Sequence, residues 1–186
     1  MAEADANGVI LQHLLGFFVD HSWKEYRWTL GPAIEELPRL RVIEFGPGPK
    51  TELWVYVTVG AWEAHKESRV EFLIVAPEKD QRHVELVTMA AWYHGQQELG
   101  VGHTLPIGEP WLPGSSCEFF LVSPPYPFGP DLEVCNFTDW HLHVQWLLPI
   151  TAAERDFKVR EGVEALEQHF DECALEYWIL DRKSVV

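Results

Sequence analysis

Lysine and arginine are scarce in this sequence. Its 186 residues contain 14 Lys and Arg against 29 Asp and Glu, so the formal net charge is −15 at pH 7. Phosphate groups would be repelled by such a surface, and this argues against a general nucleic-acid-binding protein. A strongly acidic protein instead attracts basic partners over long distances.

The basic residues are also unevenly placed, because residues 83–154 contain no Lys or Arg. A stretch of this kind is typical either of an ordinary solvated surface or of a surface that binds a basic partner, and the sequence leaves both interpretations open. Its carboxylates belong to Glu85, Glu98, Glu109, Glu118, Asp131, Glu133, Asp139 and Glu154.

Cysteine is rare, and long apolar runs are absent. The cysteines are odd in number, widely spaced and form no CxxC pair, which argues against a disulfide framework and against a zinc knuckle. The amino-terminal residues lack the basic region of a signal peptide, and His13 interrupts the apolar run that follows. We therefore expect a soluble, cytoplasmic protein that does not enter a membrane.

Apolar and aromatic residues are plentiful by comparison. They make up 47% and 13% of the chain, which is enough to bury a sizeable core. Helical spacing of apolar residues predicts helices over about 8–21 and about 80–99. Thr151 and Glu154 match a capping box at the start of a third helical stretch, which Gly162 is expected to divide.

Strand-like runs lie between and after the first two helices. Residues 140–148 alternate most clearly, and Pro149 is expected to end that strand. Consecutive strands with short connections predict one α+β domain over residues 1–186, with a mixed, mostly antiparallel sheet flanked by helices. The predicted strands cover residues 26–30, 39–45, 53–59, 69–75, 117–123, 132–137 and 140–148.

His141 and His143 form the candidate metal site. They stand two residues apart on one face of a predicted strand, about 6–7 Å apart at Cα, and His103 or Asp139 could add a third ligand. Two histidines at this spacing are more often hydrogen-bonded or half exposed, so we expect no metal and no other cofactor. A metal-binding protein or metal-dependent hydrolase is the alternative interpretation.

Interaction chemistry is better supported than catalysis, because several aromatic residues fall in loops rich in Gly and Pro. Such residues often anchor protein interfaces, although they also close the ends of a core. Carboxylates beside them would favour a partner that carries Lys and Arg. A homodimer formed through sheet edges or these loops is a further alternative. The candidate partner-binding residues are Trp62, His103, Glu109, Trp111, Tyr126, Phe128, Asp131 and Asp139.

Four segments, in order along the chain, resemble the bacterial Suppressor of fused (Sufu) family. They are YVTVG at 56–60, GVGHTLPIGEPW at 100–111, SCEFFLVSPPY at 116–126 and VQWLLPITAAERDFKVREGVEAL at 144–166. The last is the most specific, because it combines a long apolar strand, Leu-Pro-Ile-Thr and a helix with an internal Gly. Together the segments place the family-like core at about residues 25–175.

The resemblance implies an α/β sandwich-like fold and no established enzymatic activity or cofactor. Animal members of the family are two-domain proteins that bind and restrain a transcription factor in Hedgehog signalling, and this chain matches only their amino-terminal domain. Bacterial members of this length are often interpreted as immunity proteins that neutralise toxins. Together with the negative charge, the resemblance favours a non-enzymatic immunity protein that covers a basic toxin by stoichiometric binding.

Overall fold

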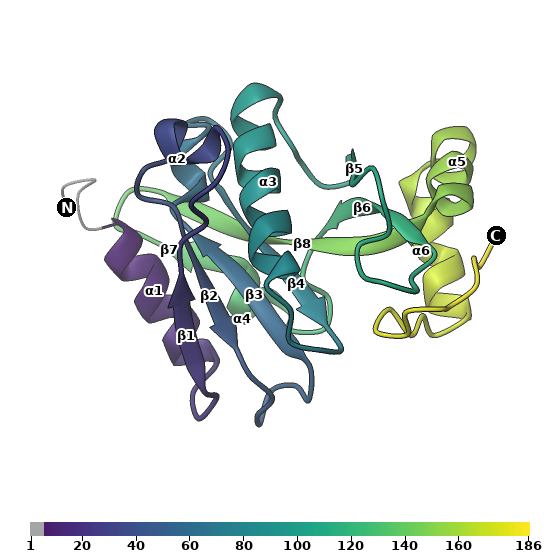
Figure 1. Cartoon of the computed structure of the whole chain (residues 1–186), viewed down its shortest axis with the longest axis horizontal. Helices are drawn as coiled ribbons and strands as arrows, with labels where there is room; N and C mark the ends of the chain where they lie inside the picture. Colours follow the sequence, from purple (N-terminus) through teal and green to yellow (C-terminus); the bar gives the residue numbers. More distant parts are fainter. Residues whose placement is uncertain (1–5) are drawn as a thin grey trace.

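A mixed sheet of eight strands forms the centre of the computed structural model, which describes residues 6–186 (Figure 1). The strands are β1 (Trp23–Tyr26), β2 (Arg41–Phe45), β3 (Trp54–Val59), β4 (Val70–Ala76), β5 (Thr104–Pro106), β6 (Cys117–Ser123), β7 (Val134–Asn136) and β8 (His141–Thr151). Their order is β1-β2-β3-β4-β8-β6-β5, and β7 pairs with β8 outside this path. The β4–β8 pair is parallel and the other described pairs are antiparallel. The predicted mixed, mostly antiparallel sheet is thus confirmed.

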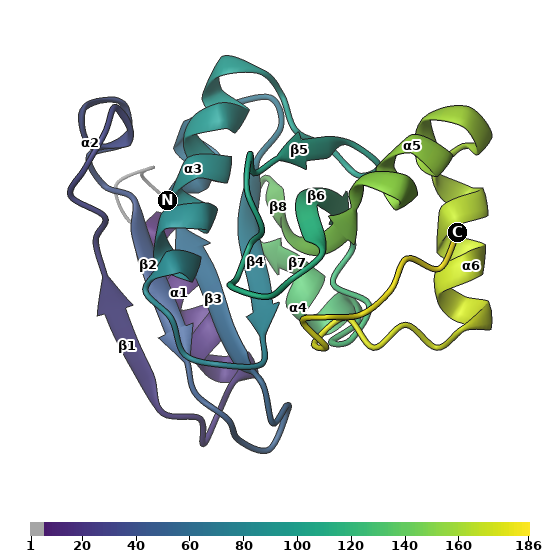
Figure 2. The same cartoon turned by 45° about the vertical axis from the view of Figure 1, so that its right-hand side comes forward.

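Helices cover both faces and one end of the sheet. They are α1 (Ala6–Phe17), α2 (Ala33–Glu36), the 3-10 helix η2 (Ala61–Glu63), α3 (Arg82–Gln96), α4 (Pro130–Glu133), α5 (Ala152–Glu161) and α6 (Val163–Glu172). In Figure 1, α3 lies in front of the sheet and α1 behind it, while α5 and α6 lie at the end that also holds the C-terminus (Figures 1 and 2). No helix within residues 6–186 has the length and apolar character that a membrane crossing requires.

The alternation of β8 divides the apolar core between the two faces of the sheet. Leu142, Val144, Trp146 and Leu148 belong to the core that α1 and α6 also line. Leu147 belongs to the core under α3. The predicted alternation is therefore confirmed, because successive side chains of a strand point to opposite faces.

β8 runs past Pro149 to Thr151, so the prediction that this proline ends the strand is wrong. Pairing with β4 stops at Trp146, whereas pairing with β6 continues as far as Thr151. One edge of β8 is therefore free of strand pairing at Pro149, and a residue without an N–H is tolerated there. Arg182 occupies this edge and donates a hydrogen bond to the Pro149 carbonyl oxygen at 2.9 Å.

Four further segments differ from the prediction. The helix predicted at about 8–21 ends at Phe17, four residues earlier. The first strand lies earlier, at β1, and β5 pairs with β6 inside the loop rich in Gly and Pro. The predicted strand at 132–137 begins instead with the helical turn α4, for which Pro130 supplies a favourable first position. Elements of three or four residues are too short for a periodic signal, and this is why their bounds were missed.

The capping box at the start of α5 is confirmed. Thr151 Oγ1 accepts a hydrogen bond from the Glu154 backbone N–H at 3.2 Å, and Glu154 Oε2 accepts one from the Thr151 N–H at 2.8 Å. Gly162, with a φ of 96°, then separates α5 from α6 as predicted. The break lets α6 place Leu166 and Phe170 in the same core as the even-numbered residues of β8.

Candidate functional site

A groove of about 610 Å³ lies where α6 and the chain after it meet β8 and the end of β6. We call it the C-terminal groove. Its volume is in the range typical of ligand-binding pockets. Its lining residues are Ser123, Tyr126, Pro127, Trp146, Leu148, Glu167, Phe170, Asp171, Ala174, Leu175 and Tyr177.

Apolar side chains form the floor of the C-terminal groove. Trp146 and Leu148 come from alternate positions of β8 and Phe170 comes from α6, and all three are buried. The Tyr177 ring packs edge-on against Trp146, with ring centroids 4.7 Å apart. Ala174 permits this contact, because its left-handed φ of 49° turns the chain back after α6. The groove thus depends on the end of one helix and the middle of one strand.

The rim of the C-terminal groove is acidic and carries one exposed aromatic ring. Tyr126 is 62% exposed, and its hydroxyl donates to a Glu167 carboxylate oxygen at 3.4 Å. Glu167 and Asp171 stand one helical turn apart, so they share a face of α6. Burial raises the pKa of the Glu167 carboxyl; the Tyr126 hydrogen bond opposes this rise, and the charges of Glu164 and Asp171 add to it. No Lys or Arg lines the groove to neutralise this charge.

Residues 83–154 lack cations in sequence, but neighbours in space supply them at several points. Arg82 donates to a Glu109 carboxylate oxygen at 2.5 Å, so this predicted partner-binding residue already has an ion pair. Arg182 likewise pairs with Glu154 in the interior. Within residues 6–186, the acidic rim of the C-terminal groove has no ion-pair partner of this kind. Glu98, Glu118, Asp131 and Asp139 likewise have no such partner among the described residues, so the rim is one of several places where negative charge is uncompensated.

Two predicted partner-binding residues, Trp62 and Trp111, are inside the protein. Trp62 is 4% exposed, and its indole N–H donates to Asn7 Oδ1 at 2.8 Å. Trp111 is 1% exposed and packs on the His83 ring, with centroids 5.6 Å apart. Both rings help to close the core, so neither can contact a partner in this conformation.

The other predicted partner-binding residues reach the surface at separate places. Phe128 is half-buried and packs edge-on against Phe17. Asp131 is exposed on α4, and His103 is exposed just before β5. Of the predicted set, Tyr126 alone lines the C-terminal groove.

Asp139, His141 and His143 line a second groove, of about 590 Å³. The two imidazole rings lie 5.1 Å apart between centroids, and His143 Nδ1 lies 3.3 Å from a Glu133 carboxylate oxygen. Within residues 6–186, no three His, Cys, Asp or Glu side chains are arranged to hold a metal ion. The contacts of the pair in this structure are thus the one between the two rings and the one from His143 to Glu133.

His103 does not join this pair. Its backbone carbonyl oxygen accepts a hydrogen bond from Val122, whose partner on β8 is Leu147. Leu147 is six strand residues from His141, which corresponds to about 20 Å along β8. Of the two third ligands considered for the alternative metal site, His103 is thus far from the pair, whereas Asp139 lines the same groove.

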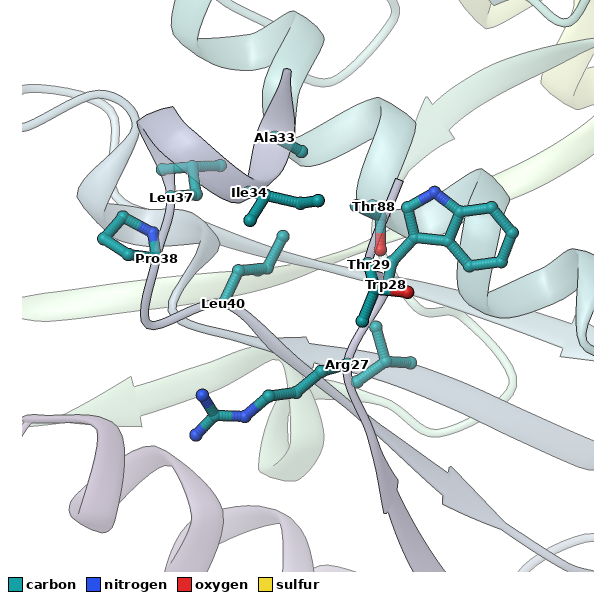
Figure 3. Close-up of a pocket in the computed structure, with 10 residues that line it drawn as sticks. Arg27, Trp28, Thr29, Ala33, Ile34, Leu37, Pro38, Leu40 and Thr88 are labelled. Atoms are coloured by element: carbon teal, nitrogen blue, oxygen red, sulfur yellow. The ribbon is translucent and has the colours of Figure 1, made fainter. Parts of the chain in front are cut away.

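A smaller pocket of about 130 Å³ lies beside α2 (Figure 3). Figure 3 shows Ala33, Ile34, Leu37 and Leu40 around it, with Trp28 on the opposite side. This volume is well below the roughly 300 Å³ of the smallest typical ligand pockets. The C-terminal groove is the better candidate, because it combines larger volume, an exposed ring and unpaired charge.

Sequence reasoning found Tyr126 but missed Glu167, Asp171 and Tyr177. These three residues follow the segment without cations, in which most of the predicted partner-binding residues lie. A signal was present in the last helix, where Glu167, Phe170 and Asp171 have the spacing of one helical face. This pattern predicts a surface helix with Phe170 towards the core and the carboxylates at its border, but it is shared by most surface helices.

The comparisons with known proteins point to one family. The model of the Suppressor of fused protein family matches residues 36–183. A Suppressor of fused homologue from Neisseria gonorrhoeae FA 1090, whose crystal structure was determined at 1.40 Å, is 37% identical; 98% of each chain is covered and the TM-score is 0.87. Among curated proteins, none matches this chain.

Two more distant structures share the fold. The Sufu chain of the Sufu–Fu complex is 14% identical over 97% of this chain and 92% of that chain, with a TM-score of 0.71. Drosophila Suppressor of Fused is 11% identical over 97% of this chain but only 51% of its own, with a TM-score of 0.63. This chain thus corresponds to about half of the Drosophila protein. The family match, the bacterial homologue and the shared sheet together show that the chain belongs to the Suppressor of fused family.

Proposed function

We propose that this protein is a non-enzymatic binding module that neutralises a basic protein by stoichiometric association, as a bacterial immunity protein does with a toxin. The observation that carries the proposal is the C-terminal groove, where an exposed Tyr126 and unpaired carboxylates surround an apolar floor. Buried aromatic anchors supply most of the affinity in protein interfaces. An acidic rim accelerates encounter with a basic partner and disfavours acidic ones.

The whole-chain charge supports the same partner chemistry. A net charge of −15 produces a long-range field that attracts a cationic protein before contact. A specific interface buries about 800 Å² on each partner, which is more than one groove provides. We therefore expect the groove to be the centre of a larger contact on the same side of the molecule.

Family membership adds a precedent at the level of the fold. The Sufu chain of the Sufu–Fu complex, which shares this fold, was crystallised with a protein partner. The further step, that the partner is a toxin which this protein neutralises, is supported by the charge and the groove of this chain.

The proposal is tested with the products of the genes next to the one that encodes this chain. Each product is produced with and without this protein in a bacterial host, and purified pairs are titrated by calorimetry at about 50 and about 500 mM NaCl. We expect one product that arrests growth, relief of that arrest by this chain, and a one-to-one complex that weakens at high salt.

Two variants locate the contact. Tyr126→Ala removes the exposed ring and should weaken the complex about tenfold or more, as expected for an interface anchor. Glu118→Gln changes an exposed carboxylate near the opposite end of β6 and should leave affinity unchanged. The proposal is wrong if no neighbouring gene product binds this protein. It is also wrong if substoichiometric amounts of this protein neutralise the product, or if the affinity does not change with salt.

A further inference from the structure

The C-terminal groove is specific enough to indicate what part of a partner enters it. We propose that it takes an extended segment of the partner in which an apolar side chain is flanked by Lys or Arg. The inference rests on the proposed function, because it assumes that the occupant is a protein. It goes further by naming the chemistry of the segment and the residues that recognise it.

The charge argument comes from the rim. Glu167 and Asp171 border the groove, and Glu133 and Glu164 lie close enough to act on the rim electrostatically. Burial raises the pKa of the Tyr126 hydroxyl, and the charges of Glu167, Asp171 and Glu133 add to this rise. A cation placed there would relieve this repulsion, whereas an acidic segment would increase it.

The aromatic rings of the groove are also without cations of their own. Elsewhere in residues 6–186, Lys or Arg side chains lie over aromatic rings, as Arg69 does over Trp140 at 4.2 Å. Tyr126, Trp146 and Tyr177 receive no such cation from the described chain. Ring faces beside carboxylates suit a Lys or Arg that is partly removed from water.

The apolar part of the segment follows from the floor. Trp146, Leu148 and Phe170 are buried side chains that still border the open volume. A volume of about 610 Å³ has room for several side chains. A Leu-sized side chain that fills part of it removes apolar surface from water, which favours binding. This contribution supplies affinity, and the charged rim then sets which sequences are accepted.

Three blocked pentapeptides test this inference. They are Gly-Lys-Leu-Lys-Gly, Gly-Glu-Leu-Glu-Gly and Gly-Lys-Gly-Lys-Gly, each titrated into the full ¹⁵N-labelled chain. The Trp146 indole N–H resonance reports occupancy and is assigned with Trp146→Phe. We expect only the first peptide to shift this resonance saturably. Glu167→Gln with Asp171→Asn should weaken its binding about three- to tenfold, while Glu118→Gln should not.

The outcomes separate the two proposals. If the acidic peptide shifts Trp146 as strongly as the basic one, or if no peptide shifts it, the groove assignment is wrong. If Glu167→Gln with Asp171→Asn still binds and neutralises the partner as well as the wild type does, the groove assignment is also wrong, but the proposed function is still supported. If the basic peptide binds as expected but no neighbouring gene product is neutralised, the groove assignment is supported and the proposed immunity function is wrong.

Discussion

Glu71 shows how a single buried carboxylate organises part of the fold. It lies on β4 and accepts hydrogen bonds from Thr58 Oγ1 at 2.6 Å, from the Gly60 N–H at 2.9 Å and from the Ala61 N–H at 3.1 Å. These bonds tie β4 to the turn after β3, where Gly60 adopts a φ of 108°. Complete burial raises the pKa of Glu71 to about 7, although the hydrogen bonds oppose the rise.

Glu71→Gln should have a stability effect that depends on pH. At about pH 4 we expect a loss of about 1–3 kcal/mol in the free energy of unfolding, because the amide places two N–H donors where the protonated carboxyl has one. The native pKa lies above the ordinary 4.5, so wild-type stability falls as pH rises from about 4.5 to about 7, whereas Gln does not titrate. Urea unfolding at about pH 4 and about pH 8 measures both proteins, and the difference in unfolding free energy between wild type and Glu71→Gln should be smaller at pH 8. A difference that grows with pH would contradict this assignment.

His83 has the opposite dependence on pH. Its fully buried ring lies between Tyr56 and Trp111, at centroid distances of 4.9 and 5.6 Å, and burial lowers its pKa to about 4. The unfolded chain binds a proton near pH 6.5 and the native chain does not, so this residue costs stability as pH falls from 6.5 toward 4.

His83→Leu removes this titration. Between about pH 8 and about pH 5, the wild type should lose about 2 kcal/mol of unfolding free energy relative to the variant. Urea unfolding at both pH values measures the difference, and Glu71→Gln serves as the comparison because its effect has the opposite sign. An equal loss in wild type and His83→Leu would show that the ring is protonated in the native state.

At the scale of elements, one buried ion pair fastens the chain end to the rest of the protein. The Arg182 guanidinium donates to both Glu154 carboxylate oxygens, at 2.6 and 2.8 Å, and also to the Pro149 carbonyl oxygen. Glu154 also completes the capping box of α5. The pair therefore joins the C-terminal segment, α5 and the unpaired edge of β8. Tyr177, a wall of the C-terminal groove, lies in the segment that it fastens.

Arg182→Ala should cost about 3–5 kcal/mol, because it leaves the Glu154 carboxylate buried without its partner. Arg182→Met combined with Glu154→Gln removes both charges and should recover part of the loss. Urea unfolding measures stability, and hydrogen exchange of residues 174–186 measures release of the segment. If Arg182→Ala leaves both unchanged, this ion pair does not hold the chain end.

Elements differ in how well the sequence predicts them. The long strands and α3 were predicted because each repeats its apolar pattern over several positions, and the capping box specifies the start of α5 by local chemistry. β5 and α4 were not predicted, because three or four residues do not complete a period. Pro149 was misread because its effect depends on whether a second strand pairs at that edge.

At the scale of the whole molecule, the free strand edges bear on the homodimer alternative. β1 forms one edge of the sheet, and β5 at the other edge is three residues long and ends in Pro106. In a two-fold antiparallel pair, opposed residues share a sheet face. If two copies of the protein pair through the middle of β1, the two-fold axis therefore places Lys24 opposite Lys24 of the second copy, or Glu25 opposite Glu25. Both arrangements oppose like charges.

We expect the free protein to be monomeric. Lys24→Val removes the charge from the edge of β1 and should increase self-association, whereas Lys66→Val, a change of the same kind outside the strands, should not. Light scattering after gel filtration over a wide range of concentrations distinguishes these outcomes. A wild-type dimer that Lys24→Val leaves intact would show that self-association uses another surface.

The sequence alone was sufficient to predict the acidic character, the mixed sheet and the break at Gly162. Charge follows from composition, and strand alternation and helix capping depend on residues that are close together in the chain. Which aromatic rings face water was decided by tertiary structure. Strand alternation does not apply to rings in loops, where Trp111 is buried and Tyr126 is exposed. Folding also placed Arg82 on Glu109 and joined the 126, 146 and 167–177 regions into one groove. These contacts link residues far apart in the chain, and only the folded chain brings them together.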